Sequence, residues 1–187
     1  MGAAAGSLFL CLGAAATAQA AAPAAGDNAE AHEVAAEFTR AQEAPQEITA
    51  GEFAAFAEGA GDPLSAREYA DAIEAAACWT HHVWSWGENI FGNKLWEWNQ
   101  EVAWCGDGQW ITSTNRQTTW GTTHWIGWNW DRDATTTSQD YGVGWNIWEV
   151  RGQGKFCYVE YFDCVQQSNP WIFHQAQGAG DAYWEAG

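Results

Sequence analysis

Tryptophan is the residue type in this sequence with the clearest chemical potential. All fifteen tryptophans lie between Trp79 and Trp184. An exposed indole stacks on sugar rings and cations, whereas a buried indole needs a partner for its N–H group. Because a small domain has difficulty burying so many indoles, we expect a surplus of them to form a ligand-binding surface. The candidates are Trp84, Trp86, Trp125, Trp128 and Trp130; the alternative is a core built from large side chains.

Paired carboxylates are the second candidate chemistry. Glu97, Glu101, Glu149 and Glu160 fall in expected strands beside tryptophans, which would suit the cleft of a glycosidase. Glu97 and Glu101, however, share the solvated face of one strand, and nothing in the sequence separates their pKa values. No G-x-S-x-G motif or reactive cysteine accompanies them. We therefore assign no catalytic residue, and a small hydrolase is the least favoured hypothesis.

Metal ligation is the third candidate chemistry. Four histidines fall in or beside expected strands: His81, His82, His124 and His174. His81 and His82 are adjacent, so in a strand they point to opposite faces and cannot share a site. The acidic loop from Asp131 to Asp140 lacks the D-x-D-x-D-G order of a calcium loop. We expect no metal and no cofactor.

The cysteines predict two disulfides. Residues 7–18 form a short apolar run followed by Ala18-Gln19-Ala20, which matches a signal peptide with its cleavage site. Removing it also removes Cys11 and leaves an even four cysteines, which admit three pairings. Cys157 and Cys164 are close enough to join adjacent strands, and Cys78 with Cys105 follows by elimination. An exported protein is the expectation.

The elements that position these residues are mostly strands. From Lys94 to Trp104 the apolar residues alternate, so that Trp96, Trp98 and Trp104 share a buried face opposite Glu97 and Glu101. Similar segments separated by turn residues predict seven or eight strands. They are 79–86, 94–104, 109–114, 118–130, 143–151, 156–161, 171–176 and a possible last strand at 181–185. This spacing predicts an all-β fold, a single antiparallel sandwich or barrel-like domain.

The segment before this domain has a different composition. Residues 21–77 are acidic and rich in alanine, and we expect residues 21–48 to be mostly flexible. Thr49 with Glu52 and Ser65 with Glu68 have capping-box spacing, which predicts two short helices. The expected organisation is a signal peptide (1–20), an acidic prosegment or linker (21–77) and a Trp-rich β domain (78–187).

Three stretches of the β domain form a recurring set of motifs: Leu95 to Trp98, Val102 to Thr112, and Gln153 to Cys157 followed by Cys164 and Asn169 to Ile172. In these stretches the domain resembles a group of uncharacterised secreted actinobacterial proteins. In that group these stretches form an L-W-x-aromatic strand, a V-x-W-C-x-x-G hairpin and a Q-G-K-F segment. The resemblance implies fold and secretion and supplies no activity.

Net charge limits the partners. The formal net charge of −17 repels phosphate backbones and anionic lipid, so nucleic acid is not an expected partner. No apolar segment is long enough for a stable transmembrane helix. We expect a secreted, non-catalytic binding module whose exposed aromatic residues meet polysaccharide, cell envelope or protein. The alternative is a secreted effector or bacteriocin-like toxin that its prosegment keeps inactive until processing.

Overall fold

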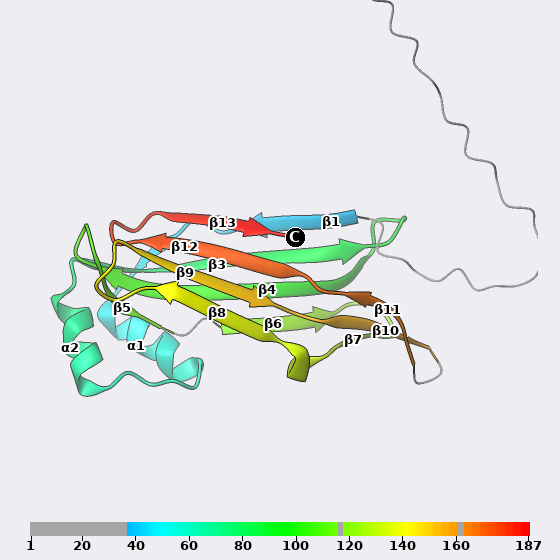
Figure 1. Ribbon diagram of the computed structural model, residues 1–187, viewed down its shortest axis with the longest axis horizontal. Helices are drawn as coiled ribbons and strands as arrows, with labels where there is room; N and C mark the ends of the chain where they lie inside the picture. Colours follow the sequence, from blue (N-terminus) through cyan, green and yellow to red (C-terminus); the bar gives the residue numbers. More distant parts are fainter. Residues whose placement is uncertain (1–36, 116–117, 161–162) are drawn as a thin grey trace, which may run out of the picture. The chain divides into compact units, whose positions relative to one another are not determined.

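Two antiparallel layers make up the domain. The structure, a computed structural model, describes residues 37–115, 118–160 and 163–187, all within one compact unit (Figure 1). Sheet A forms the first layer around the long hairpin of β3 (Ala77–Glu88) and β4 (Lys94–Gly106). Its remaining strands pair with the outer edges of that hairpin. They are β1 (Glu37–Gln42) and β2 (Gln46–Ile48) on β3, and β5 (Ile111–Thr114) and β6 (Thr118–Thr123) on β4.

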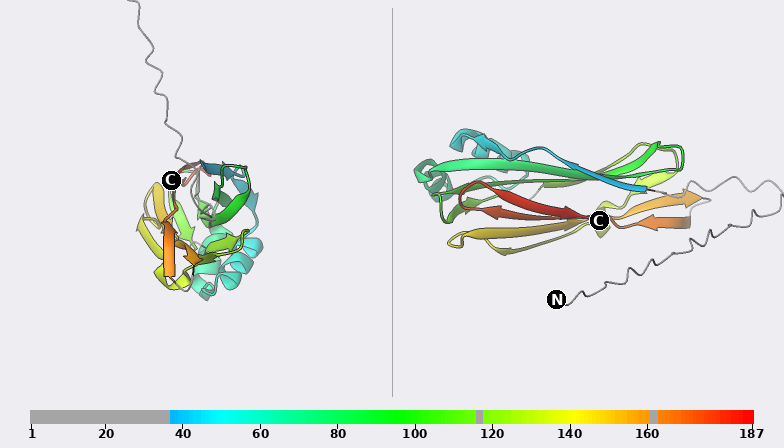
Figure 2. Two further views of the ribbon diagram at one scale, coloured as in Figure 1. Left: turned by 90° about the vertical axis from the view of Figure 1, so that its right-hand side faces the viewer. Right: turned by 90° about the horizontal axis from the view of Figure 1, so that it is seen from above.

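Two smaller sheets form the second layer (Figure 2). The four-stranded sheet has the order β13 (Ala182–Ala186), β12 (Trp171–Gln177), β9 (Ile147–Gln153) and β8 (Thr136–Tyr141). The three-stranded sheet has the order β11 (Asp163–Ser168), β10 (Phe156–Glu160) and β7 (Trp128–Trp130). All strand pairs are antiparallel, so the predicted all-β sandwich-like fold is confirmed.

The alternation of β4 builds the core. Trp96, Trp98 and Trp104 point inward and are at most 1% exposed, as their period of two predicts. Trp104 packs in one cluster with Trp148 and Val150 of the second layer. A second cluster around Trp96 and Trp98 contains Trp128, Phe156 and Ile172. Large aromatic side chains therefore fill most of the space between the layers.

Two helices cover the outer face of sheet A at one end. Helix α1 (Ala50–Gly59) and helix α2 (Ala66–Glu74) each begin with a complete capping box, at Thr49 and Ser65, as predicted. They bury Phe53 and Ala72 against Cys78 and Cys105.

A short 3-10 turn, η1 (Arg132–Ala134), follows β7. The disulfides Cys78–Cys105 and Cys157–Cys164 have the predicted pairing.

The start of the domain differs from the prediction. Residues 37–48 were expected to be flexible, but β1 and β2 pair with β3 and belong to the same compact unit as the strands after Cys78. A boundary at residue 77 is therefore wrong, because backbone hydrogen bonds hold these strands although they offer few large apolar side chains. The expected signal peptide (1–20) lies outside the described residues.

The strand boundaries differ in three further places. The expected strand 118–130 is broken into β6 and β7 by a turn at Gly127. The expected loop 131–141 contains the edge strand β8, all of whose side chains are exposed. Strand β11 was not predicted. Polar edge strands lack a buried face, so their sequences have no apolar alternation to reveal them.

Candidate functional site

The five candidate tryptophans do not form one surface. Trp84 and Trp86 lie on the outer face of sheet A, and Trp125 lies in the β6–β7 loop with 40% of its surface exposed. Trp130 is half-buried against the core beneath Arg132, whose guanidinium carbon lies 5.0 Å from the ring centre. Trp128 is only 3% exposed and belongs to the core. Its assignment to a ligand-binding surface is wrong, because β7 turns this side chain inward.

The aromatic rings on the outer face of sheet A pack against neighbouring side chains of that face. The ring of His82 stacks between Trp84 and Trp120, at centre distances of 4.9 and 5.2 Å. Trp86 carries the ammonium of Lys94 over its face at 4.5 Å, and its Nε1 donates to Glu88 at 2.6 Å. These side chains satisfy each other and leave little ring face for a ligand.

The same face carries two of the four carboxylates considered for catalysis, while Glu149 and Glu160 lie in β9 and β10. Glu97 accepts from Lys94 at 2.6 Å and from Asn99 at 3.1 Å. Burial opposes ionisation, but these hydrogen bonds and the charge of Lys94 outweigh it and lower the pKa of Glu97. Glu101 lies four residues after Glu97 in β4 and accepts a hydrogen bond from the hydroxyl of Thr80 at 3.2 Å. The arrangement holds Glu97 ionised, whereas a glycosidase acid needs a raised pKa.

A cleft at the far end of β4 exposes two other tryptophans. Trp110 and Trp145 line a hollow of about 520 Å³ and are 42% and 54% exposed. Three turns build it: β4–β5, β8–β9 and β12–β13. Its lining residues are all uncharged: Gly108, Gln109, Trp110, Trp145, Asn146, Gln177, Gly178 and Ala179. We call this hollow the Trp110–Trp145 cleft.

Backbone hydrogen bonds tie the three turns to one another. Trp145 O accepts from Ile111 N at 2.7 Å, which joins the first two turns. Gly178 joins both to the third, since its O accepts from Gly108 N and its N donates to Asn146 O, each at 3.1 Å. A Cβ at Gly178 would lie 2.6 Å from Trp110 N, so only glycine permits this approach. The cleft is therefore preformed, which reduces the entropy lost on binding.

Local contacts orient each tryptophan. The Asp107 carboxylate accepts from the backbone N–H groups of Trp110 at 2.7 Å and Gln109 at 2.9 Å, and these bonds lower its pKa. Tyr141 packs edge-on against Trp145, with ring centres 5.3 Å apart. Among the described residues, Tyr141 is the one non-glycine with a positive φ, 64°. Such strain is commonest at functional sites.

The Asp107 contact gives a prediction about the cleft without its ligand. Asp107→Ala removes the acceptor of two backbone N–H groups, so we expect the Trp110 amide to exchange its hydrogen on the order of tenfold faster. Asp107→Asn keeps the side-chain oxygen and serves as the matched control. Hydrogen–deuterium exchange measured by NMR compares the variants. Equal Trp110 exchange in both would contradict the assigned role of Asp107.

The arrangement suits binding of a neutral polar ligand. Two indole faces can pack against the apolar faces of sugar rings, and the amides of Gln109, Asn146 and Gln177 offer hydroxyl groups both donors and acceptors. Apolar walls with a few polar groups are typical of ligand sites.

Sequence reasoning missed Trp110 and Trp145 because each was assigned to a strand. Their position directly after a glycine-containing turn is the signal that could have identified them.

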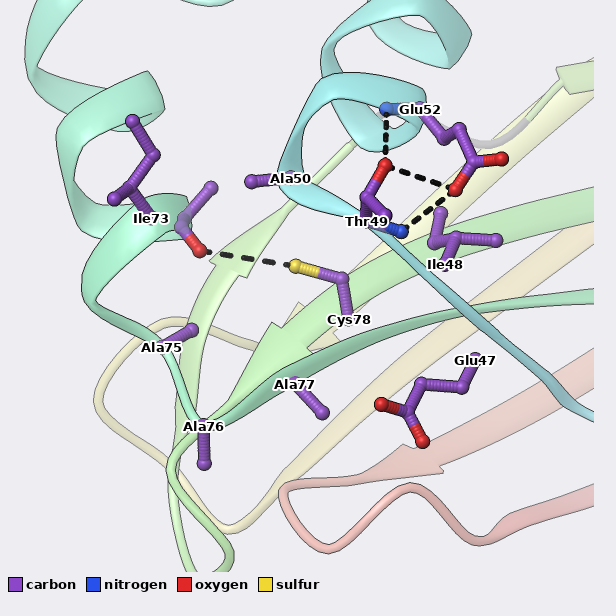
Figure 3. A pocket seen from close by; sticks show the side chains of 11 residues that line it. Glu47, Ile48, Thr49, Ala50, Glu52, Ile73, Ala75, Ala76, Ala77 and Cys78 are labelled. Carbon is purple, nitrogen blue, oxygen red and sulfur yellow. Dashed lines mark hydrogen bonds between the residues drawn. The ribbon is translucent and has the colours of Figure 1, made fainter.

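A second hollow lies beside the helices (Figure 3). It has a volume of about 380 Å³, and five of its eleven lining residues are alanines, beside Ile48 and Ile73. The carboxylate of Glu52 faces it but accepts from the backbone N and hydroxyl of Thr49, at 2.7 and 2.9 Å. Sγ of Cys78 lies 4.0 Å from Ala72 O. Its polar groups serve the helix cap, and we interpret it as the seam where the helices meet sheet A.

A buried histidine pair lies between the layers. His81 of β3 and His174 of β12 pack edge to face, with ring centres 4.9 Å apart. His81 Nε2 lies 2.9 Å from Gln42 Oε1, and His174 Nδ1 lies 2.7 Å from Gln100 Nε2. Burial lowers the pKa of His81 to about 4. Burial also lowers the pKa of His174 well below its usual range, and the nearby His81 lowers it further. Both imidazoles are therefore neutral at pH 7.

Other candidate sites are accounted for by local contacts. Asp131 accepts from Ala134 N at 3.3 Å to cap η1 and lies 3.3 Å from Lys155. In the described ranges, no group of three or more His, Cys, Asp or Glu side chains is arranged to hold a metal ion. The described part of the chain also has no helix long and apolar enough to cross a membrane.

Comparison with known proteins returns no match: no family model, no curated protein and no solved structure is significantly similar to the chain.

Proposed function

We propose that the chain is an exported, non-catalytic binding module that holds an uncharged saccharide in the Trp110–Trp145 cleft. One observation carries the proposal: two exposed indoles flank a preformed, uncharged hollow rimmed by amide side chains. The net charge of −17 disfavours anionic polysaccharides. Two disulfides fit an oxidising compartment, which supports export, as does the resemblance to secreted actinobacterial proteins.

The alternatives have less support. The effector hypothesis depends on an inhibitory segment that can be detached, but residues 37–77 supply strands and helices of the domain itself. The hydrolase hypothesis needs a proton donor, whereas the pKa of Glu97 is lowered. Neither hypothesis has a specific observation in its favour.

Affinity electrophoresis tests the proposal. Gels contain either neutral polysaccharides (soluble cellulose derivatives, xylan, glucomannan, β-glucan) or anionic ones (alginate, pectin). We expect retardation by at least one neutral polymer. Trp110→Ala and Trp145→Ala should each weaken binding by about 2 kcal/mol, roughly 30-fold, as for central aromatic residues of binding sites.

Trp125→Ala is the matched control, since Trp125 is similarly exposed but lies outside the cleft. Its affinity should stay within about twofold of the unmodified chain, because it makes no contact with a ligand there. No retardation by any polymer would contradict the proposal. So would an equal loss in all three variants.

A further inference from the structure

Two turns at the opposite end of β4 present apolar side chains to solvent. Ile90 and Phe91 lie in the β3–β4 turn and are each 77% exposed. Trp125 and Ile126 lie in the β6–β7 loop and are 40% and 93% exposed. We call these four side chains the apolar tips. Exposure as high as that of Ile90, Phe91 and Ile126 means that these three side chains project from the surface and do not line a groove.

The two turns belong to the same end of sheet A. Leu95 O, just after the first turn, accepts from His124 N at 2.9 Å and from Trp125 N at 3.3 Å. Trp96 pairs with Thr123, so β6 ends beside the start of β4. Both turns lie at the right-hand end of sheet A in Figure 1. The Trp110–Trp145 cleft lies thirteen strand residues away, roughly 40 Å along β4.

Part of the backbone of each turn is paired by hydrogen bonds. The side-chain oxygen of Asn89 accepts from Phe91 N and Asn93 N, each at 3.0 Å. Asn89 N donates to Asn93 O, and Gly92 N donates to Asn89 O. In the second turn Gly127 O accepts from Val159 N at 2.8 Å. Paired backbone groups are what an apolar solvent requires, because unpaired ones cost several kcal/mol there.

Two of the charges beside the apolar tips, Lys94 and Glu88, are engaged. Lys94 lies 2.6 Å from a carboxylate oxygen of Glu97 and over the ring of Trp86. Glu88 accepts from Trp86 Nε1. The four tip residues carry no charge, while the whole chain carries −17. An anionic bilayer would repel this chain, whereas a zwitterionic one would not.

We propose that the apolar tips insert into the interface of a zwitterionic phospholipid bilayer and hold the domain at that surface. Ile90, Phe91 and Ile126 enter the acyl region, while Trp125 lies at the interface, where indoles are enriched. A bilayer accepts separate convex tips, whereas a protein partner would need hollows matching two turns. This inference is independent of the proposed saccharide site.

Flotation with phosphatidylcholine vesicles tests the inference on the full chain. The double variant Ile90→Ser/Phe91→Ser and the single variant Ile126→Ser should each lower the vesicle-bound fraction at least about tenfold, because burial of large apolar side chains is lost. Val143→Ser, which removes a 61% exposed apolar side chain at the cleft end of the domain, should bind as the unmodified chain does. The substituted residues are exposed, so thermal melting should show that every variant remains folded.

Vesicles with brominated acyl chains locate the contact. Bromine quenches nearby indoles, so the quenching should fall in Trp125→Phe and persist in Trp145→Phe.

Absence of flotation, unchanged flotation of the tip variants, or quenching that falls in Trp145→Phe instead would overturn the inference. Sedimentation provides a further check: a dimer that disappears in the Ile90→Ser/Phe91→Ser variant, without flotation, would assign the tips to self-association. Saccharide binding should be unchanged in these tip variants.

Discussion

Acidification from pH 7 to pH 4 is expected to lower the free energy of unfolding by about 3 kcal/mol through His81 alone. The pKa of this imidazole is about 4 in the folded chain, against 6.5 for an unperturbed histidine. Each unit of difference corresponds to about 1.4 kcal/mol between the two protonation states. His174, with its pKa lowered in the same direction, adds to the effect.

The direction follows from proton binding. Between pH 6.5 and 4 the unfolded chain binds protons at these histidines while the folded chain leaves them neutral. The free energy of unfolding therefore has its full value above pH 6.5. It declines as the pH falls, until His81 itself is protonated near pH 4. The lowered pKa values of Glu52, Glu68, Glu97 and Asp107 act in a lower window, below the ordinary carboxylate values.

Denaturant unfolding at a series of pH values measures this effect. In the double variant His81→Gln/His174→Gln the decline between pH 6.5 and 4 should largely disappear, whatever its stability at pH 7. His124→Gln is the matched control, because His124 lies in the β6–β7 loop with its side chain 38% exposed. Its profile should follow that of the unmodified chain. An undiminished decline in the double variant would show that the histidine pair is not the cause.

A chain that begins at Ala76 is expected not to reach the native fold. Such a chain lacks β1 and β2, which occupy the outer edge of β3, and lacks α1 and α2. Phe53 and Ala72 would no longer cover Cys78, Ala103 and Cys105. The free energy of unfolding falls by an amount on the order of 5 kcal/mol or more, which is comparable to the whole stability of a small domain.

Circular dichroism and limited proteolysis compare this fragment with one that begins at Glu33. The longer fragment keeps the complete compact unit and should melt cooperatively at the temperature of the full chain. The shorter one should be protease-sensitive and show no cooperative transition. Cooperative melting of the shorter fragment near the same temperature would restore residues 21–77 as a detachable prosegment.

The parts of the fold that could be predicted are those with a local signal. The inward tryptophans of β4 follow from a period of two, and both helix starts follow from their capping boxes. The disulfide pairing follows from the spacing of Cys157 and Cys164. Strands β1, β2 and β8 lack such signals, because backbone pairing and not apolar alternation holds them.

The candidate site could be predicted in kind but not in place. The excess of tryptophan indicates exposed indoles, and Trp110 and Trp145 are such residues. Their meeting depends on three turns that are distant in the chain and tied through Gly178. The environment of each tryptophan also depends on its neighbours in the sheet: β7 buries Trp128, whereas Trp84 stacks on His82 and Trp86 packs beneath Lys94 of β4. No local pattern encodes those contacts.

The most direct test of the saccharide proposal is an NMR titration of the fifteen indole N–H groups. Single Trp→Phe variants assign the signals, and an oligosaccharide from the most strongly retarding neutral polymer is the titrant. The proposal predicts that the signals of Trp110 and Trp145 shift together with the side-chain amides of Gln109 and Asn146. Shifts confined to Trp84, Trp86 and Trp120 on sheet A, or no shift at all, would contradict it.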